Sequence, residues 1–323
     1  MPAGRAVMMA LVFTAPGELE MRDVPDPEPA DGEVLVHVRA AGICGSELHG
    51  ARHPGFRVPP LIMGHEFAGL SDNGDRVLIN PILSCGHCSL CGRGLRYLCA
   101  DRALIGVHRP GGFAERVAVP AGAARPLPDW LSWSEAAVVE PAANAVHAWN
   151  LGRGGPGHRV AVLGCGAIGL LCLLTALAGG ADQVEVTDLS PVRLAAARRL
   201  GAAAAGTTLT GEYDVVIDAV GSAVTRALSV QHQRPGGVAV WLGLAEQAAG
   251  FDAPALVRGE KSVLGSFGYT DDEFDGATAL LRDANLSWVV PYPLAAGAQI
   301  FTELMNGRLD PVKALLSPEP GPA

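Results

Sequence analysis

The feature that most constrains this chain is a group of four cysteines within fifteen residues. Cys85, Cys88, Cys91 and Cys99 have the spacing C-x2-C-x2-C-x7-C. Four thiolates this close in sequence can surround one zinc ion as a closed tetrahedral shell, which leaves no open position for chemistry. Disulfides are the alternative. We expect no signal peptide, and three of the seven cysteines lie elsewhere, so disulfides are disfavoured. The spacing therefore predicts a structural zinc site.

Length and composition are those of a soluble protein with about two domains. The chain has 323 residues, 49% hydrophobic and 18% charged, which is more than one core usually supports. We find no apolar stretch of the roughly 20 residues that a membrane span needs. The net charge of -9 and the scattered basic residues disfavour nucleic acid, which binds clustered positive charge. We expect neither membrane nor nucleic-acid partners, and the reducing cytoplasm as the compartment.

The first part of the chain has a β pattern. Short Val-rich runs at 33–39, 76–80 and 114–119 are separated by proline-rich and polar turns, as in a small antiparallel barrel or sandwich. The four cysteines lie between two of these runs, as a loop insertion. The pattern predicts a mostly-β domain over residues 1–146.

From His158 the pattern changes to alternating strands and helices. Helical segments separate apolar strand-like segments at 159–163, 183–187, 213–218, 237–242 and 262–267. Continuous apolar strands with helical crossovers indicate a parallel sheet that is covered on both faces. The sequence thus predicts a doubly wound α/β domain over residues 147–286, followed by a segment, 287–323, that returns to the β domain.

A glycine fingerprint opens the α/β region. Gly164, Gly166 and Gly169 form G-x-G-x-x-G, with Ile168 at a variable position, between a predicted strand and a predicted helix. In a dinucleotide site the first glycine permits the tight turn, the second lets the backbone approach a pyrophosphate, and the third allows close helix packing. The phosphates then lie at the helix N-terminus. Another tight strand-to-helix turn is the alternative.

An acidic residue follows at the distance that this fingerprint requires. Asp188 ends the next predicted strand and is placed to accept hydrogen bonds from an adenosine ribose. Its charge would repel a 2′-phosphate, so NAD is predicted in preference to NADP. Arg193 either covers the adenine, or weakens that preference, or is an ordinary surface arginine. Cys165 and Cys172 are expected to be small buried side chains.

Three segments that are distant in sequence carry further metal-binding side chains. They are Gly42–His49, the Gly-His-Glu motif at 64–66, and Glu140 with Pro141. Together with the four cysteines and the fingerprint, these motifs resemble the zinc-dependent medium-chain dehydrogenases/reductases of the alcohol dehydrogenase superfamily, most closely the polyol (sorbitol) and threonine dehydrogenase branch. The resemblance covers nearly the whole chain. It implies a GroES-like catalytic domain and a Rossmann domain.

The resemblance also implies a second, catalytic zinc. Its ligands would be Cys44, His65 and a carboxylate, from Glu66, Glu140 or both, and such a shell keeps a position open for water or substrate. A cysteine commonly replaces Glu140 in the alcohol dehydrogenase branch, so glutamate favours the polyol-like branch. The alternatives are a buried free cysteine and salt bridges of the glutamates, for example to Arg76.

The implied activity is hydride transfer between an alcohol and NAD(P), with zinc as Lewis acid. Ser46 and His49 match the family's proton-relay hydroxyl and imidazole, and a surface histidine is the alternative for His49. Glu47 stands where the family usually has Asp. The predicted catalytic residues are Cys44, Ser46, His49, His65 and Glu66.

A polyol, cyclitol, sugar or amino alcohol is the expected substrate, and a homodimer or homotetramer the expected assembly. An NADPH-dependent carbonyl reductase of the same family and a non-catalytic nucleotide-binding scaffold are the competing functions.

Overall fold

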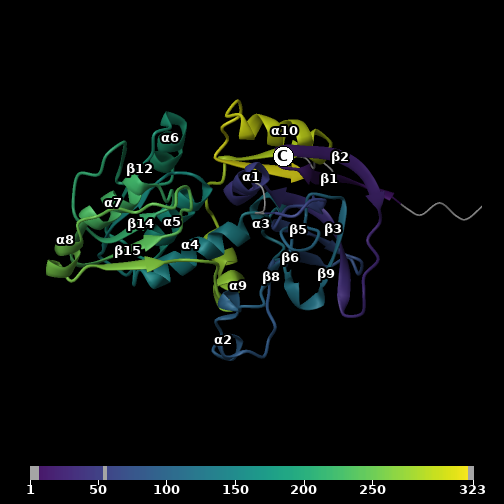
Figure 1. The fold of residues 1–323 in the computed structure, drawn as a ribbon, viewed down its shortest axis with the longest axis horizontal. Coiled ribbons are helices and arrows are strands. Elements are labelled where there is room, and N and C mark those ends of the chain that lie inside the picture. Colours follow the sequence, from purple (N-terminus) through teal and green to yellow (C-terminus); the bar gives the residue numbers. More distant parts are fainter. Residues whose placement is uncertain (1–6, 54–56, 319–323) are drawn as a thin grey trace, which may run out of the picture. The chain divides into compact units, whose positions relative to one another are not determined.

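The computed structural model describes residues 7–53 and 57–318. It contains two compact units, Met1–Glu140 with Leu286–Ala323, and Pro141–Asn285 (Figure 1). The division falls at Glu140, in the first turn of helix α4 (Val139–Leu151). The domain limits 1–146, 147–286 and 287–323 stay a prediction. None of the helices in the described ranges has the length and apolar character that crossing a bilayer requires.

Strands dominate the first unit. Its main sheet has the order β10-β6-β5-β3-β18-β17, with β9 also paired to β3, and a smaller sheet has the order β2-β1-β4. The strands are β1 (Val7–Ala15), β2 (Glu18–Pro25), β3 (Glu33–Gly42), β4 (Leu61–Ile62), β5 (Glu66–Ser71), β6 (Arg76–Ile79), β7 (Ile82–Leu83), β8 (Ala103–Leu104), β9 (Arg116–Pro120), β10 (Ala124–Pro126), β17 (Val289–Pro293) and β18 (Lys313–Ser317). The helices are α1 (Gly45–Arg52), α2 (Ser89–Gly92), α3 (Trp133–Ala136) and α10 (Gly297–Met305).

One apolar core holds this unit together. Phe13, Phe67, Phe113 and Phe301 are each at most 2% exposed and belong to a single hydrophobic cluster. Burying a side chain of this size stabilises the fold by about 1.5–3 kcal/mol. The cluster fixes β1, β5 and α10 around β3, so the end of β3 has a defined position.

The end of β3 is where two partner strands meet. Gly42 pairs with Glu66 of β5 and with Leu315 of β18, both antiparallel. Segments more than two hundred residues apart in sequence are thus brought together at the end of β3, a central strand of this unit's main sheet. This register determines which side chains lie around the end of β3.

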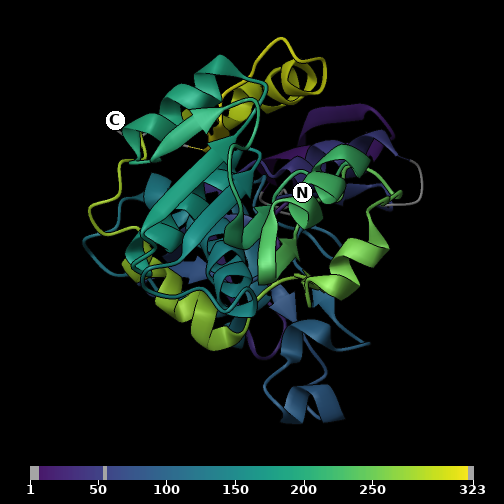
Figure 2. The same ribbon diagram turned by 90° about the vertical axis from the view of Figure 1, so that its left-hand side faces the viewer.

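The second unit has a parallel sheet, as predicted. Within the described residues its order is β13-β12-β11-β14-β15-β16, and every neighbouring pair is parallel. The strands are β11 (Arg159–Leu163), β12 (Gln183–Thr187), β13 (Ala204–Gly206), β14 (Tyr213–Asp218), β15 (Gln233–Trp241) and β16 (Ser262–Gly265). Figure 2 shows helices on both sides of this sheet. They are α4, α5 (Ala167–Ala178), α6 (Pro191–Arg199), α7 (Ala223–Gln231), α8 (Ala253–Arg258) and α9 (Asp271–Leu280).

Two local differences from the sequence prediction have simple causes. β13 was not predicted, because it arises in a run of alanines that carries no strand pattern. β15 begins at Gln233 instead of 237, because the strand continues through a Pro-Gly-Gly segment that usually marks a turn; its pairing with β14 is irregular there. Helix α5 is apolar on all sides and largely buried, as expected for a helix that is covered all round.

Candidate metal and cofactor sites

The four clustered cysteines converge on one point. The Sγ–Sγ distances are 3.9 Å for Cys85 and Cys91, 3.5 Å for Cys88 and Cys91, 3.9 Å for Cys88 and Cys99, and 3.5 Å for Cys99 and Cys85. A tetrahedron with Zn–S bonds of about 2.3 Å has edges of about 3.8 Å. All four are free thiols, far from the S–S bond length of about 2.05 Å. The donor set therefore fits one zinc ion with no position left open.

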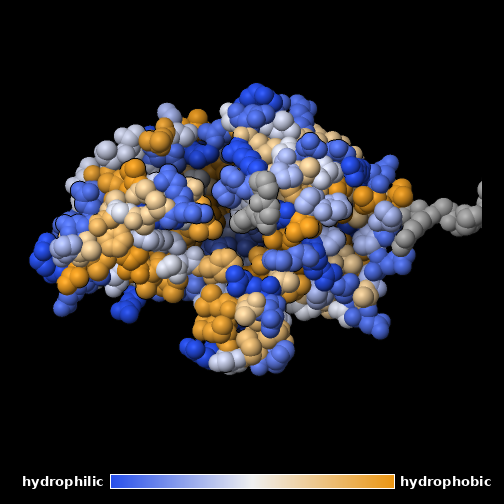
Figure 3. Space-filling model, in the orientation of Figure 1, coloured by the Kyte–Doolittle hydropathy of each residue, from blue (hydrophilic) through white to orange (hydrophobic). Residues whose placement is uncertain are grey.

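The local backbone positions the cysteines of this lobe and favours the thiolate form of Cys85. Cys88 caps the one-turn helix α2 and Cys91 lies within it. The backbone around His87 and Cys88 hydrogen-bonds the Cys85 sulfur and lowers the pKa of that thiol, which favours the thiolate that a metal requires. Figure 3 shows the lobe as a knob on the surface. Such a small projection has little core of its own.

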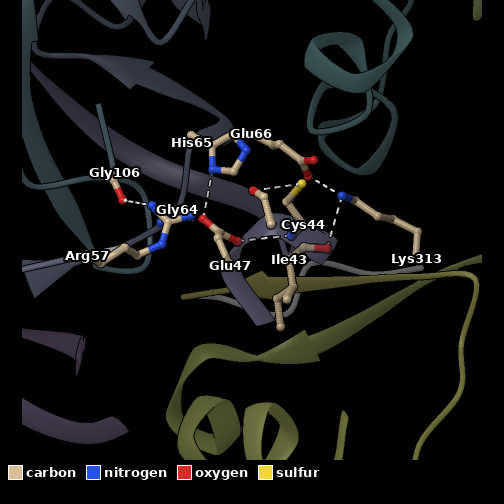
Figure 4. A network of polar contacts seen from close by, with 10 residues as sticks. Ile43, Cys44, Glu47, Arg57, Gly64, His65, Glu66, Gly106 and Lys313 are labelled. Atoms are coloured by element: carbon tan, nitrogen blue, oxygen red, sulfur yellow. Dashed lines mark hydrogen bonds and ion pairs between the residues drawn. The ribbon is translucent and has the colours of Figure 1, made fainter. Parts of the chain in front are cut away.

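A second group of metal-binding atoms lies at the end of β3. The ligand atoms of Cys44, His65 and Glu66 all lie within 4.8 Å of one another (Figure 4). The pairing of Gly42 with Glu66 explains the convergence, because Cys44 follows β3 and His65 precedes β5. His65 is 7% and Glu66 1% exposed, whereas Cys44 is half-buried. One sulfur, one nitrogen and one oxygen fit a zinc ion that keeps a position for a further ligand.

Glu47 holds this group in place. One carboxylate oxygen, Oε1, accepts hydrogen bonds from His65 Nδ1 at 3.0 Å and Gly64 N at 2.8 Å, and the other accepts from Cys44 N at 3.0 Å. Glu47 is fully buried. Burial raises the pKa of Glu47, but the positive charges of His65 and Arg57 and the hydrogen bonds to the carboxylate lower it by more. The net effect is a lowered pKa, which favours the charged carboxylate. An anionic acceptor at Nδ1 leaves Nε2 of His65 for a metal. From the sequence, Glu47 had no role beyond replacing Asp. The available signal was its place in the first turn of α1, three residues after Cys44.

Replacing Glu47 with glutamine should weaken zinc binding at this group by about 10–100-fold, as is typical when a partner of a metal ligand is lost. The neutral amide cannot match the carboxylate as acceptor for His65 Nδ1. Competition against a chelator measures the affinity, with the four-cysteine zinc as an internal reference. Glu47→Asp keeps the charge and should stay closer to wild type. Unchanged affinity in Glu47→Gln would contradict the positioning role.

Glu66 forms a buried salt bridge, with Lys313 and not with Arg76. Lys313 Nζ pairs with Glu66 Oε2 and donates to the Ile43 carbonyl at 3.1 Å. Burial alone would lower the pKa of Lys313, but the neighbouring acidic groups, Glu66 first and then Cys44, raise it. Arg76 instead lies over the Trp133 ring, 4.5 Å from its centroid. Lys313 was not predicted as a site residue, although a lysine in an apolar strand is a usable signal.

The remaining predicted residues near this group have different surroundings. Ser46 Oγ donates to Cys44 Sγ at 3.3 Å. His49 lies on the exposed side of α1, with its ring 4.3 Å from that of His53. Glu140 is 9% exposed in the first turn of α4, and its carboxylate is not part of the ligand group within 4.8 Å. The structure thus brings Ser46 to the metal-binding atoms and leaves Glu140 outside them.

The glycine fingerprint forms the turn between β11 and α5. Gly164 has φ +92°, which side chains rarely adopt, and a Cβ on Gly169 would collide with the Gly164 carbonyl oxygen. Gly166 caps α5 without a side-chain partner, and a Cβ there would meet no atom within 4 Å. The N-terminus of α5 therefore has space beside it and free N–H donors, and the half-buried Ile168 lies in its first turn.

Asp188 is tied to this turn. Its Oδ2 accepts from Cys165 N at 2.7 Å and its Oδ1 from Ser190 N at 2.8 Å. Arg193 lies near enough for its charge to act on the Cys165 thiol. Cys165 and Cys172 are fully buried, and burial raises the pKa of both thiols to about 12. They are therefore unreactive side chains of the core.

Comparison with known proteins agrees with this geometry. Residues 30–129 match the family model of the alcohol dehydrogenase GroES-like domain, and residues 167–283 match that of the zinc-binding dehydrogenases. L-galactonate-5-dehydrogenase of Escherichia coli is 31% identical over 94% of this chain and 97% of its own length. The chain belongs to the zinc-dependent medium-chain dehydrogenases.

Two further members of the family are similar to it. Sorbitol dehydrogenase of Bacillus subtilis is 31% identical over 82% of this chain and 83% of its own length. A zinc-binding dehydrogenase of Sinorhizobium meliloti, solved bound to NADP, has a TM-score of 0.89 at 29% identity and covers 97% of this chain and 100% of its own. The predicted GroES-like and Rossmann architecture and the polyol and threonine dehydrogenase branch are confirmed, and the chain is an NAD(P)-dependent zinc oxidoreductase.

Proposed function

We propose that this enzyme oxidises a hydroxyl group of a polyol, cyclitol, sugar or amino alcohol, with Cys44, His65 and Glu66 holding its catalytic zinc. The observation that carries the proposal is the convergence of these three ligand atoms within 4.8 Å. A zinc ion bound there supplies a Lewis acid that lowers the pKa of an alcohol hydroxyl. The sulfur and carboxylate donors balance the charge of a divalent ion. Similarity to sorbitol and galactonate dehydrogenases supports a polyhydroxylated substrate.

Ser46 and His49 are proposed to move the hydroxyl proton to solvent. The Ser46 hydroxyl lies 3.3 Å from Cys44 Sγ, at the edge of the ligand group, and can exchange that partner for a substrate hydroxyl. His49 is exposed on the same helix. An imidazole titrates near neutral pH and can release a proton to water.

The turn at Gly164–Gly169 is proposed to hold the cofactor. N–H groups in the first turn of α5, around Ile168, would bind the pyrophosphate, because a helix N-terminus favours anions. Asp188, half-buried and held by two backbone N–H groups, would accept hydrogen bonds from the adenosine ribose. Its negative charge opposes a 2′-phosphate, so NAD is the proposed cofactor. Arg193 would cover the adenine.

The decisive experiment is an assay of a panel of alcohols and the matching ketones with both cofactors, together with zinc analysis. The proposal expects two zinc ions per chain and NAD reduction with polyhydroxylated alcohols. Turnover of ketones with NADPH alone would favour the carbonyl reductase. One zinc per chain and no turnover with any pair would favour the nucleotide-binding scaffold.

Replacing Asp188 with alanine should move cofactor preference from NAD toward NADP. A hydrogen bond to a charged group contributes about 1.5–3 kcal/mol, so kcat/KM with NAD should fall by roughly 10–100-fold. Activity with NADP should rise, because the repulsion of the 2′-phosphate is gone. Steady-state kinetics with both cofactors measures the ratio. Asp182→Ala, at an exposed position of the same unit, is the matched control. An unchanged ratio would contradict the assignment.

Assembly and compartment complete the proposal. We propose a homodimer or homotetramer in which β16, an edge strand of its sheet, pairs with a second copy, because an edge strand offers unpaired backbone groups. The cytoplasm is the proposed compartment, because a reducing environment keeps the clustered cysteines as thiols that can bind metal.

A further inference from the structure

The carboxylate of Glu66 faces two positively charged partners. One is the metal that Cys44 and His65 would share with it; the other is Lys313, whose Nζ contacts Glu66 Oε2. Glu66 is 1% and Lys313 3% exposed, so both charged groups are shielded from bulk water. The lysine also donates to the Ile43 carbonyl at 3.1 Å, which holds its ammonium group beside the ligand group.

The backbone at the end of β3 leaves space for the Glu66–Lys313 ion pair. A Cβ on Gly42 would collide with Glu66 Oε2 and come within 2.9 Å of Lys313 Cε. The absence of a side chain at Gly42 thus leaves the space that the carboxylate and the ammonium occupy. Lys313 reaches this position because β18 pairs with the end of β3, with Leu315 opposite Gly42. The contact is thus buried and follows from the pairing of β3 with β5 and β18.

The positive charge of Lys313 determines how the Lys313–Glu66 ion pair affects metal binding. The thiolate of Cys44 and the carboxylate of Glu66 together balance a divalent ion, and Lys313 adds one further positive charge in a buried site. The ammonium repels the ion and occupies part of the carboxylate that would bind it. In the metal-free protein the same ammonium balances Glu66, which would otherwise be a buried unpaired charge.

We propose that Lys313 is a positioning residue that competes with the catalytic metal for Glu66, keeping that carboxylate a weak and exchangeable ligand. The inference rests on the proposed function, since it assumes zinc at Cys44, His65 and Glu66. Removing the ammonium makes Glu66 a full ligand, so the metal is held more tightly. A lysine with a purely structural role would leave metal release unchanged.

The test measures release of zinc to a chelator from the full-length enzyme carrying Lys313→Met, which has a similar length and no charge. Release from the catalytic site should be slowed by at least about tenfold, because the repulsion between two buried positive charges a few ångströms apart exceeds the free energy that a tenfold change requires. Lys313→Arg keeps the charge and should stay near wild type. The Cys44→Ser variant identifies which release phase belongs to the four-cysteine site. In the cobalt-substituted enzyme, the visible d–d absorption should change in Lys313→Met and not in Lys313→Arg.

A double variant separates competition from simple repulsion. In the Glu66→Gln background, Lys313→Met should slow release much less, because there is no carboxylate to compete for. Equal slowing in both backgrounds overturns the proposal, and so does wild-type release in Lys313→Met. Should Lys313→Met fail to fold, Lys313→Gln replaces it with the same expectation.

Failure of the proposed function has a different signature. A wild-type enzyme with only the four-cysteine zinc would overturn both proposals. An active wild-type enzyme with two zinc ions and unchanged release in the lysine variants would overturn the role of Lys313 alone.

Discussion

Cys44→Ser is expected to abolish turnover while the protein stays folded. The Cys44 sulfur is the soft donor of a group whose other ligand atoms lie within 4.8 Å, and serine offers a poor ligand for zinc. Lewis-acid activation contributes several kcal/mol to the transition state, so kcat should fall by roughly a thousandfold or more. The side chain is half-buried and lies outside the hydrophobic cluster of its unit, so the unfolding temperature should change little.

Kinetics, metal analysis and thermal unfolding together test whether Cys44→Ser loses turnover and one zinc ion while it stays folded. One zinc per chain should remain, in the four-cysteine lobe. Cys172→Ala, in the buried apolar helix α5, is the control and should keep both zinc ions and turnover. Wild-type kcat in Cys44→Ser would refute zinc catalysis at this site.

Cys91→Ser is expected to destabilise the fold, whereas Cys44→Ser is expected to remove turnover without unfolding the protein. Its lobe consists of the short elements β7, α2, a 3-10 helix (Arg96–Leu98) and β8, which bury too little apolar surface to fold by themselves. Structural zinc contributes an apparent 10–16 kcal/mol in small zinc-binding peptides, comparable with the whole stability of a domain. We expect one zinc fewer per chain, a lower unfolding temperature and rapid proteolysis within 82–104. An unchanged unfolding temperature after loss of that zinc would contradict a structural role.

Local patterns in the sequence were sufficient for much of this molecule. The four cysteines and the glycine fingerprint each lie within fifteen consecutive residues, so their spacing alone carries the geometry. Apolar strands such as Arg159–Leu163 were found with their observed bounds because a buried parallel strand has a continuous apolar signal.

The catalytic group depends on long-range register, and there the sequence was weaker. Cys44, His65 and Glu66 could be grouped only by family resemblance, and Glu66 could not be separated from Glu140. Glu47 and Lys313 had no assigned role, because their importance follows from how β3, β5 and β18 pair. No pattern within a single segment reports that pairing. The roles of Glu140, Ser46 and His49 stay predictions.

The order of the strands has a consequence for synthesis on the ribosome. β17 and β18 are the last strands among the described residues, yet they belong to the same sheet as β3, β5 and β6, which precede the second unit in the sequence. Every residue of the second unit is therefore translated before Lys313. Since domains generally fold as units while translation proceeds, the Rossmann unit is ready first. The contact between Lys313 and Glu66 forms only after this, when β18 pairs with the end of β3.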